Sequence, residues 1–184
     1  MIKLVIFDLD GVLVDARELH YLAMNEALAE IDPKYVINRD EHLARYDGLS
    51  TTKKLKMLTE EKGLDPEHYN EVWKLKQLKT RNIIASDITE DLRLKNVIKT
   101  LKQDGYTIAV ASNSIRETVK MMLLKKGFLE YIDFYYSNQD VSNPKPNPEM
   151  YYKCMIKAGV SSKETLIVED SHIGRKAALS SGAH

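Results

Sequence analysis

The chain has 184 residues, and its 27 lysines and arginines balance its 27 aspartates and glutamates, so the formal net charge is zero. This length is enough for one compact domain with a sizeable core and an insertion. Basic residues form no dense run, which argues against a nucleic-acid partner, and the apolar runs are too short to cross a bilayer. The single cysteine, Cys154, allows no internal disulfide, which favours a reducing, cytoplasmic setting. We also expect a monomer with no membrane partner.

Four short apolar segments have the character of buried parallel strands, because they are rich in branched residues and poor in polar ones. They span residues 2–7, 106–111, 132–136 and 166–168. Apolar residues recur at helical spacing in the segments between them, at 94–101, 115–123 and 151–158. Strands that alternate with helices in this way predict an α/β fold with a doubly wound parallel sheet.

Local signals mark the ends of these helices. Ser114 with Glu117 has the pattern of a capping box. Asn147 followed by Pro148 has the pattern of an N-cap and a first-turn proline. Glycines stand where the helices should end, at Gly105, Gly127 and Gly159.

The interval from about residue 15 to residue 88 breaks the alternation, because its apolar spacing predicts helices and no convincing strand. A crossover between parallel strands needs only about a dozen residues. We therefore predict a helical cap domain at 15–88, inserted into an α/β core domain formed by 1–14 plus 89–184. Residues 179–184 have the pattern of a helix end and the entry to another strand, which predicts either a fragment or a dispensable last strand.

Polar residues follow each predicted strand. The carboxyl ends of parallel strands meet at one edge of the sheet, where ligands bind in such folds. We therefore expect an acidic cluster, a hydroxyl and an ammonium to lie together at that edge. The residues concerned are Asp8 and Asp10 after the first strand, Ser112 after the second, Lys145 after the third, and Glu169 and Asp170 after the fourth.

These residue types suit the transfer of a phosphoryl group. Clustered carboxylates repel one another, so we expect a divalent cation among them, and all-oxygen ligands select Mg²⁺ over Zn²⁺. The metal and Lys145 would neutralise the charge of a phosphate ester, and Ser112 with nearby backbone N–H groups would hold its oxygens. In the Asp-x-Asp pattern, one acid can attack while the other gives a proton to the leaving oxygen.

The segment FDLDGVLVD, which ends at Asp15, resembles the first signature of the haloacid dehalogenase superfamily. Ser112, Lys145 and the run from Glu169 to Gly174 resemble its second, third and fourth signatures, in the same order. The helical insertion resembles the C1-type cap of that superfamily. The subgroup that the chain resembles most contains β-phosphoglucomutase and small sugar-phosphate phosphatases.

The resemblance implies a role for each matching residue. Asp8 would form an aspartyl-phosphate, and Asp10 would act first as general acid and then as base for the hydrolytic water. Mg²⁺ would be held by the carboxylates of Asp8 and Asp170 and by the carbonyl of Asp10, with Glu169 as a further metal ligand or in a supporting position. The residues expected to bind the phosphoryl group are Ser112, Asn113 and Lys145.

Four residues of the predicted cap are candidates for contact with the substrate. His20 matches a histidine at the cap hinge of mutase-like proteins, or else lies on an exposed helix face. Lys76 is placed to reach a substrate, although lysines on helices are usually solvated. Asp47 and Gly48 form either a specificity loop or a simple connection between helices.

The predicted function is Mg²⁺-dependent hydrolysis of a small phosphate ester, with a sugar phosphate as the default substrate. The first alternative is a phosphosugar mutase. Mutase-like proteins carry an arginine just after a Gly-x-Ser segment of the cap, whereas Ser50 is followed here by Thr51, Thr52 and Lys53, which favours hydrolysis. The second alternative is a non-catalytic module that accepts a phosphoryl group or binds a sugar phosphate, and it would need neither a cap nor Asp10.

Overall fold

The computed structural model describes residues 1–47 and 49–184. The chain divides into two compact units, each with its own internal packing. The core unit comprises Met1–Asp15 and Ile88–His184, and the helical unit comprises Ala16–Asp87. The assignment of two domains, 1–14 plus 89–184 and 15–88, stays a prediction.

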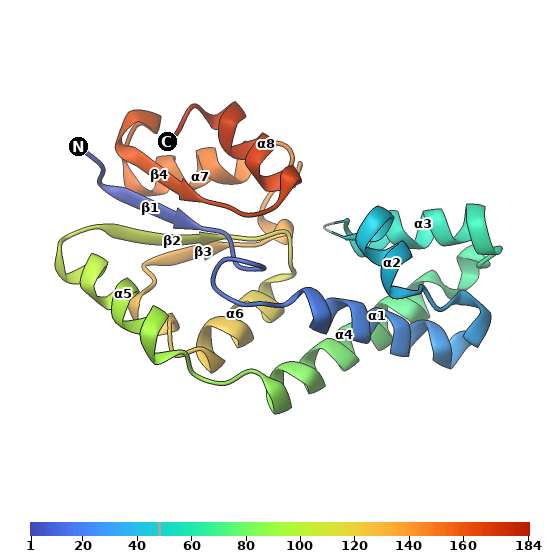
Figure 1. Cartoon of the computed structure of the whole chain (residues 1–184). Helices are drawn as coiled ribbons and strands as arrows, with labels where there is room; N and C mark the ends of the chain where they lie inside the picture. The colour runs from blue at the N-terminus through green and yellow to red at the C-terminus, as the bar shows by residue number, and fades with distance from the viewer. Residues whose placement is uncertain (48) are drawn as a thin grey trace. The chain divides into compact units, whose positions relative to one another are not determined.

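The core unit is built on one parallel sheet with the strand order β3-β2-β1-β4 (Figure 1). Its strands are β1 (Leu4–Phe7), β2 (Thr107–Ala111), β3 (Phe134–Tyr136) and β4 (Thr165–Val168). At the carboxyl end of the central strand, Phe7 is in register with Val110 on one side and with Val168 on the other. All four predicted strands are present, and the predicted doubly wound α/β fold is confirmed.

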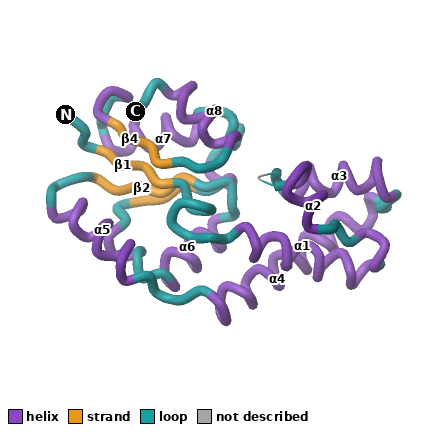
Figure 2. The backbone as a smooth tube through the Cα atoms, in the orientation of Figure 1, coloured by secondary structure: helices purple, strands orange, loops and turns teal. Residues whose placement is uncertain are grey.

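Helices lie on both faces of this sheet, with α5 and α6 on one side and α7 and α8 on the other (Figures 1 and 2). Their bounds are α5 (Leu92–Gln103), α6 (Arg116–Lys125), α7 (Glu149–Ala158) and α8 (His172–Ser181), with single turns η4 (Leu129–Tyr131), η5 (Asn138–Asp140) and η6 (Ser162–Glu164). Because side chains alternate along a strand, Leu4 and Ile6 face α7, where they join Tyr151 and Cys154 in one buried cluster. This cluster packs α7 against one face of the sheet.

The helix ends follow the predictions in part. The predicted glycines all take positive φ angles, at Gly105, Gly127 and Gly159. The predicted capping box at Ser114 is wrong, because α6 starts after Ile115 and has no side-chain cap. The Ser114 hydroxyl instead donates to Asp10 Oδ2 at 2.9 Å. The start of α7 lies one residue later than predicted, although Asn147 Oδ1 does accept the N–H of Glu149 at 2.9 Å.

In its described residues the helical unit contains helices and turns and no strand, as predicted. Its elements are α1 (Arg17–Ile31), η1 (Pro33–Tyr35), α2 (Arg39–Glu41), η2 (His42–Tyr46), α3 (Thr51–Lys62), η3 (Pro66–His68) and α4 (Tyr69–Asp87). Met24, Leu28, Tyr46, Leu58 and Val72 belong to a buried cluster of its own. None of the helices in the described part of the chain has the length and apolar character needed to cross a membrane.

The segment after α8 pairs with the sheet. The helix is followed by Gly182, which has a positive φ of 74°. His184 then donates its N–H to the carbonyl of Thr165 at 3.1 Å and accepts the N–H of Ile167 at 2.8 Å. The predicted entry to a further strand is therefore seen as far as His184, on the edge of β4.

Candidate active site

Asp8 lies where the central strand β1 reaches the carboxyl edge of the sheet. Its backbone N–H donates to the carbonyl of Val168 at 2.9 Å, which continues the pairing with β4. The residue is only 6% exposed. Burial raises the pKa of Asp8 to about 7, against the opposing effect of the Lys145 ammonium and with a further contribution from the charge of Glu169.

Lys145 neutralises this buried acid from the loop that precedes α7. Its Nζ donates to Asp8 Oδ1 at 2.7 Å, to Glu169 Oε1 at 2.7 Å and to the carbonyl of Ala111 at 2.8 Å. These three bonds use all three donors of the ammonium. Burial by itself lowers the pKa of an ammonium, but the surrounding negative charges, with Asp8 foremost, outweigh it and raise the pKa of Lys145.

Asn113 holds the backbone of that loop. Its Oδ1 accepts the N–H of Lys145 at 3.0 Å, and its Nδ2 donates to the carbonyl of the same residue at 3.1 Å. Two bonds to one residue fix the position of the loop relative to the end of β2. Asn113 therefore sets the place from which the Lys145 ammonium reaches the two carboxylates.

Glu169 is saturated with hydrogen-bond donors. Its Oε1 accepts from Lys145 Nζ at 2.7 Å and from the Tyr151 hydroxyl at 3.3 Å. Its Oε2 accepts from the N–H and from the hydroxyl of Ser171, each at 3.0 Å. Four donors occupy the roughly four lone-pair positions of a carboxylate. This arrangement fixes Glu169 toward α7 and α8.

Tyr151 is a further residue of the site, although its place on an apolar helical stripe predicts only a position in the core. Its ring lies 5.0 Å from Lys145 Nζ, as measured to the ring centroid, so it supports the ammonium through a cation–π contact as well as through Glu169. The available signal was the hydroxyl itself, because a tyrosine on a buried stripe needs a hydrogen-bond partner.

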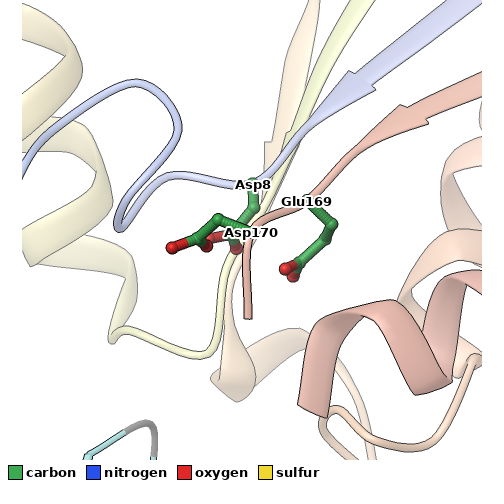
Figure 3. Close-up of side chains that lie close together, drawn as sticks. All are labelled: Asp8, Glu169 and Asp170. Carbon is green, nitrogen blue, oxygen red and sulfur yellow. The ribbon is translucent and has the colours of Figure 1, made fainter. Parts of the chain in front are cut away.

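Asp170 completes the acidic cluster. Asp8, Glu169 and Asp170 each offer a carboxylate oxygen, and these oxygens all lie within 4.8 Å of one another. Figure 3 shows Asp8 and Asp170 side by side, with the Glu169 carboxylate turned toward the other side of the site. Gly11 leaves room for the Asp170 carboxylate, because a Cβ at Gly11 would lie 2.1 Å from Asp170 Oδ2. Such an all-oxygen set fits a hard divalent cation.

Two serines connect the end of β2 to Asp10. The buried Ser112 Oγ accepts the N–H of Ser114 at 3.0 Å, and the Ser114 hydroxyl donates to Asp10 Oδ2 at 2.9 Å. Ser114 thus orients one oxygen of Asp10. The structure brings together, around this edge of the core unit, Asp8, Asp10, Ser112, Asn113, Lys145, Glu169 and Asp170.

The other candidates belong to the helical unit. His20 lies on α1 and Lys76 on α4. Asp47 follows η2 and forms an ion pair with Arg17 Nε at 3.1 Å. Gly48 lies outside the described residues. The proposed contact of these four residues with a substrate stays a prediction.

Gly174 in α8 makes room for the Glu169 carboxylate, because a Cβ there would lie 1.6 Å from Glu169 Oε1. We expect Gly174→Ala to lower the free energy of unfolding by about 1–3 kcal/mol through overpacking, even though alanine favours a helix over glycine by about 1 kcal/mol. Urea denaturation measures this change. The exposed Ser180→Ala in the same helix should shift stability by no more than about 0.5 kcal/mol, and a fully stable Gly174→Ala variant would contradict the geometry.

The model of the family described as haloacid dehalogenase-like hydrolase matches residues 5–184. The chain belongs to this family. The resemblance predicted from the sequence is thereby confirmed, and so is the prediction that the protein is a haloacid dehalogenase-like hydrolase.

One relative and two solved structures are similar to the chain over most of its length. Pyrophosphatase PpaX from Halalkalibacterium halodurans is 31% identical over 92% of this hydrolase and 75% of its own length. The structure of a CbbY variant from Rhodobacter sphaeroides, in complex with xylulose-1,5-bisphosphate, covers 100% of this chain and 84% of its own, with a TM-score of 0.89 at 22% identity. A putative β-phosphoglucomutase from Thermotoga maritima gives a TM-score of 0.76 at 25% identity, over 99% of this chain and 82% of its own.

Proposed function

We propose that this protein is a Mg²⁺-dependent phosphatase that uses Asp8 as a covalent nucleophile against a small phosphorylated metabolite. The observation that carries the proposal is the place of Asp8, a buried carboxylate at the edge of the sheet with Lys145 Nζ at 2.7 Å and Asp170 beside it. The Lys145 ammonium, together with a cation held by the two carboxylates, would offset the charge of an anionic group that Asp8 would otherwise repel.

In the first step a carboxylate oxygen of Asp8 forms a bond to phosphorus, and the bond from phosphorus to the leaving oxygen breaks. Asp10, oriented by Ser114, gives its proton to that oxygen. In the second step water attacks phosphorus, Asp10 takes the proton of the water, and the bond from phosphorus to Asp8 breaks. Inorganic phosphate leaves, and both acids return to their starting forms.

The phosphoryl group would be bound by Lys145 and Ser112. The amide of Asn113 already bonds the backbone of Lys145 at both ends, so we infer that Asn113 mainly positions Lys145. The Lys145 ammonium already faces Asp8, so it lies where negative charge collects during the transfer.

Asp8 and Asp170, with the carbonyl of Asp10, would hold the metal. Because donors already fill both oxygens of Glu169, we assign Glu169 to the support of Lys145 rather than to direct coordination. The bound Mg²⁺ would supply positive charge that offsets the charge of the transferring phosphoryl group. The cytoplasmic location and the monomeric state stay predictions.

A phosphate-release screen tests this function. The panel holds sugar phosphates, nucleotides, small phosphoacids and pyrophosphate, the last because a 31% identical relative is named a pyrophosphatase. We expect release from at least one compound with Mg²⁺, and a loss on the order of 100-fold or more when the metal is chelated. Absence of release from every compound, or release that chelation leaves untouched, would refute the proposal.

A phosphosugar mutase is the second candidate, because the chain shares its fold with a putative β-phosphoglucomutase at 25% identity. Incubation with β-glucose 1-phosphate separates the two functions, because a mutase yields glucose 6-phosphate and a phosphatase yields free phosphate. Thr51, where mutase-like proteins carry arginine, favours phosphate as the product. A non-catalytic module would instead stay phosphorylated without turnover.

A further inference from the structure

The helical unit buries a lysine that the catalytic machinery does not use. Lys54 lies in the first turns of α3, which begins at Thr51 after the N-cap Ser50. The residue is 7% exposed, whereas its neighbour Lys53 lies on the exposed side of the helix. Because an unpaired ammonium is costly to bury, a lysine in this position calls for a functional explanation.

The partner of Lys54 is a histidine and not an acid. Its Nζ lies 3.5 Å from His42 Nε2, and it forms no ion pair with any described residue. The nearby Asp47 is engaged by Arg17 at 3.1 Å. Burial, assisted by the charge of Lys76, lowers the pKa of Lys54 to about 8, with Asp47 opposing.

His42 is suited to hold the ammonium without neutralising it. The residue is 2% exposed and meets the Tyr21 ring edge-on at 5.1 Å between ring centroids. Burial, followed by the charge of Lys54, lowers the pKa of His42 to about 4. The imidazole is therefore neutral near pH 7 and can accept one N–H of the ammonium, which leaves two donors for another acceptor.

The position of Lys54 near the amino terminus of α3 also favours a bound anion. The amino-terminal turn of a helix carries partial positive charge and N–H groups without partners within the helix, so a buried cation there is doubly unfavourable. A bound oxyanion would offset both charges and accept the remaining N–H groups of Lys54. Among the described residues, no carboxylate takes this place.

We propose that Lys54, backed by His42, is the anion-binding group of the helical unit and holds an oxyanion, a phosphate or a carboxylate, of a small ligand. That oxyanion has two possible sources. It is either a second anionic group of the substrate, a reading that rests on the proposed function, or a separate small anion. The two arms of the test distinguish these sources.

The first arm is independent of catalysis. Inorganic phosphate is titrated into the full-length protein by calorimetry in metal-free buffer, where the carboxylates of Asp8, Glu169 and Asp170 repel an anion from the core unit. We expect the wild type and the exposed control Lys53→Met to bind phosphate alike. Lys54→Met should bind about 10-fold more weakly or worse, because a hydrogen bond to a charged group is lost.

The second arm identifies the source of the anion. With Mg²⁺ present, kcat/KM is compared for phosphoglycolate, which carries a carboxylate, and for ethyl phosphate, which does not. If Lys54→Met lowers kcat/KM for phosphoglycolate about 10-fold more than for ethyl phosphate, the anion is the second group of the substrate. Equal effects on both esters, together with lost phosphate binding, assign a separate anion.

Stability separates a binding role from a structural one. Replacing a buried, unpaired ammonium by methionine should raise the melting temperature, whereas removal of a structural lysine would lower it. The proposal is overturned if the wild type takes up no phosphate, or if Lys54→Met binds it as the wild type does. Failure of both esters to release phosphate would exclude them as substrates, and calorimetry would still decide on the anion site.

Discussion

Asp8→Asn is expected to abolish phosphate release, with a loss on the order of 10⁴-fold or more in kcat. The amide is nearly isosteric with the carboxylate, so packing at the end of β1 is kept, but it is a far weaker nucleophile. Lys145 retains Glu169 and the carbonyl of Ala111 as acceptors, so the variant should still fold. Steady-state phosphate release with the best compound of the screen measures the effect.

The matched control for this variant is Asp104→Asn, an exposed acid of the core unit just after α5. It should keep its activity within about 2-fold, because exposed substitutions outside a site have small effects. Circular dichroism of both variants checks that the fold is intact. If folded Asp8→Asn keeps most of its turnover, Asp8 does not carry the covalent step.

Lys145→Met is expected to lower both activity and stability. The 6% exposed ammonium is shared by Asp8 and Glu169. Its removal leaves two buried carboxylates without their cation, which costs about 3–5 kcal/mol when one partner of a buried pair is lost. We expect kcat to fall on the order of 100-fold or more, because charge on the phosphoryl group is no longer offset.

Urea denaturation with and without Mg²⁺ separates the two effects. Without metal, Lys145→Met should unfold at clearly lower urea than the wild type, and Mg²⁺ should restore part of its stability by binding the uncompensated acids. The exposed Lys157→Met, at the end of α7, should change stability by no more than about 0.5 kcal/mol. Equal stability of Lys145→Met and the wild type would contradict the buried charge network.

The fold was predictable where short-range patterns decide it. Each strand is a brief apolar run that only a two-sided sheet can bury, and each helix stripe ends at a glycine that takes a positive φ. The carboxyl edge then follows from the rule for parallel sheets, so the grouping of Asp8, Lys145 and Asp170 needed no knowledge of distances. The missed start of α6 shows the limit of such patterns.

Ser114 illustrates why that limit exists. The spacing of Ser114 and Glu117 fits a capping box, but Asp10, 104 residues away along the chain, takes the hydroxyl instead. Lys54 is a similar case. It shares a helix face with Leu58, four residues on, yet a lysine is ordinarily expected to be exposed. Tertiary partners decide both residues, and a single sequence does not contain them.

The most direct test of the central claim is to trap the phosphorylated enzyme. The wild type is mixed with substrate and Mg²⁺, quenched in acid during turnover and reduced with borohydride, which converts an acyl phosphate to an alcohol. Mass spectrometry of the peptide that contains Asp8 should then show homoserine at position 8 and unmodified Asp10. Turnover with no modification of Asp8 at any time point would contradict the covalent mechanism.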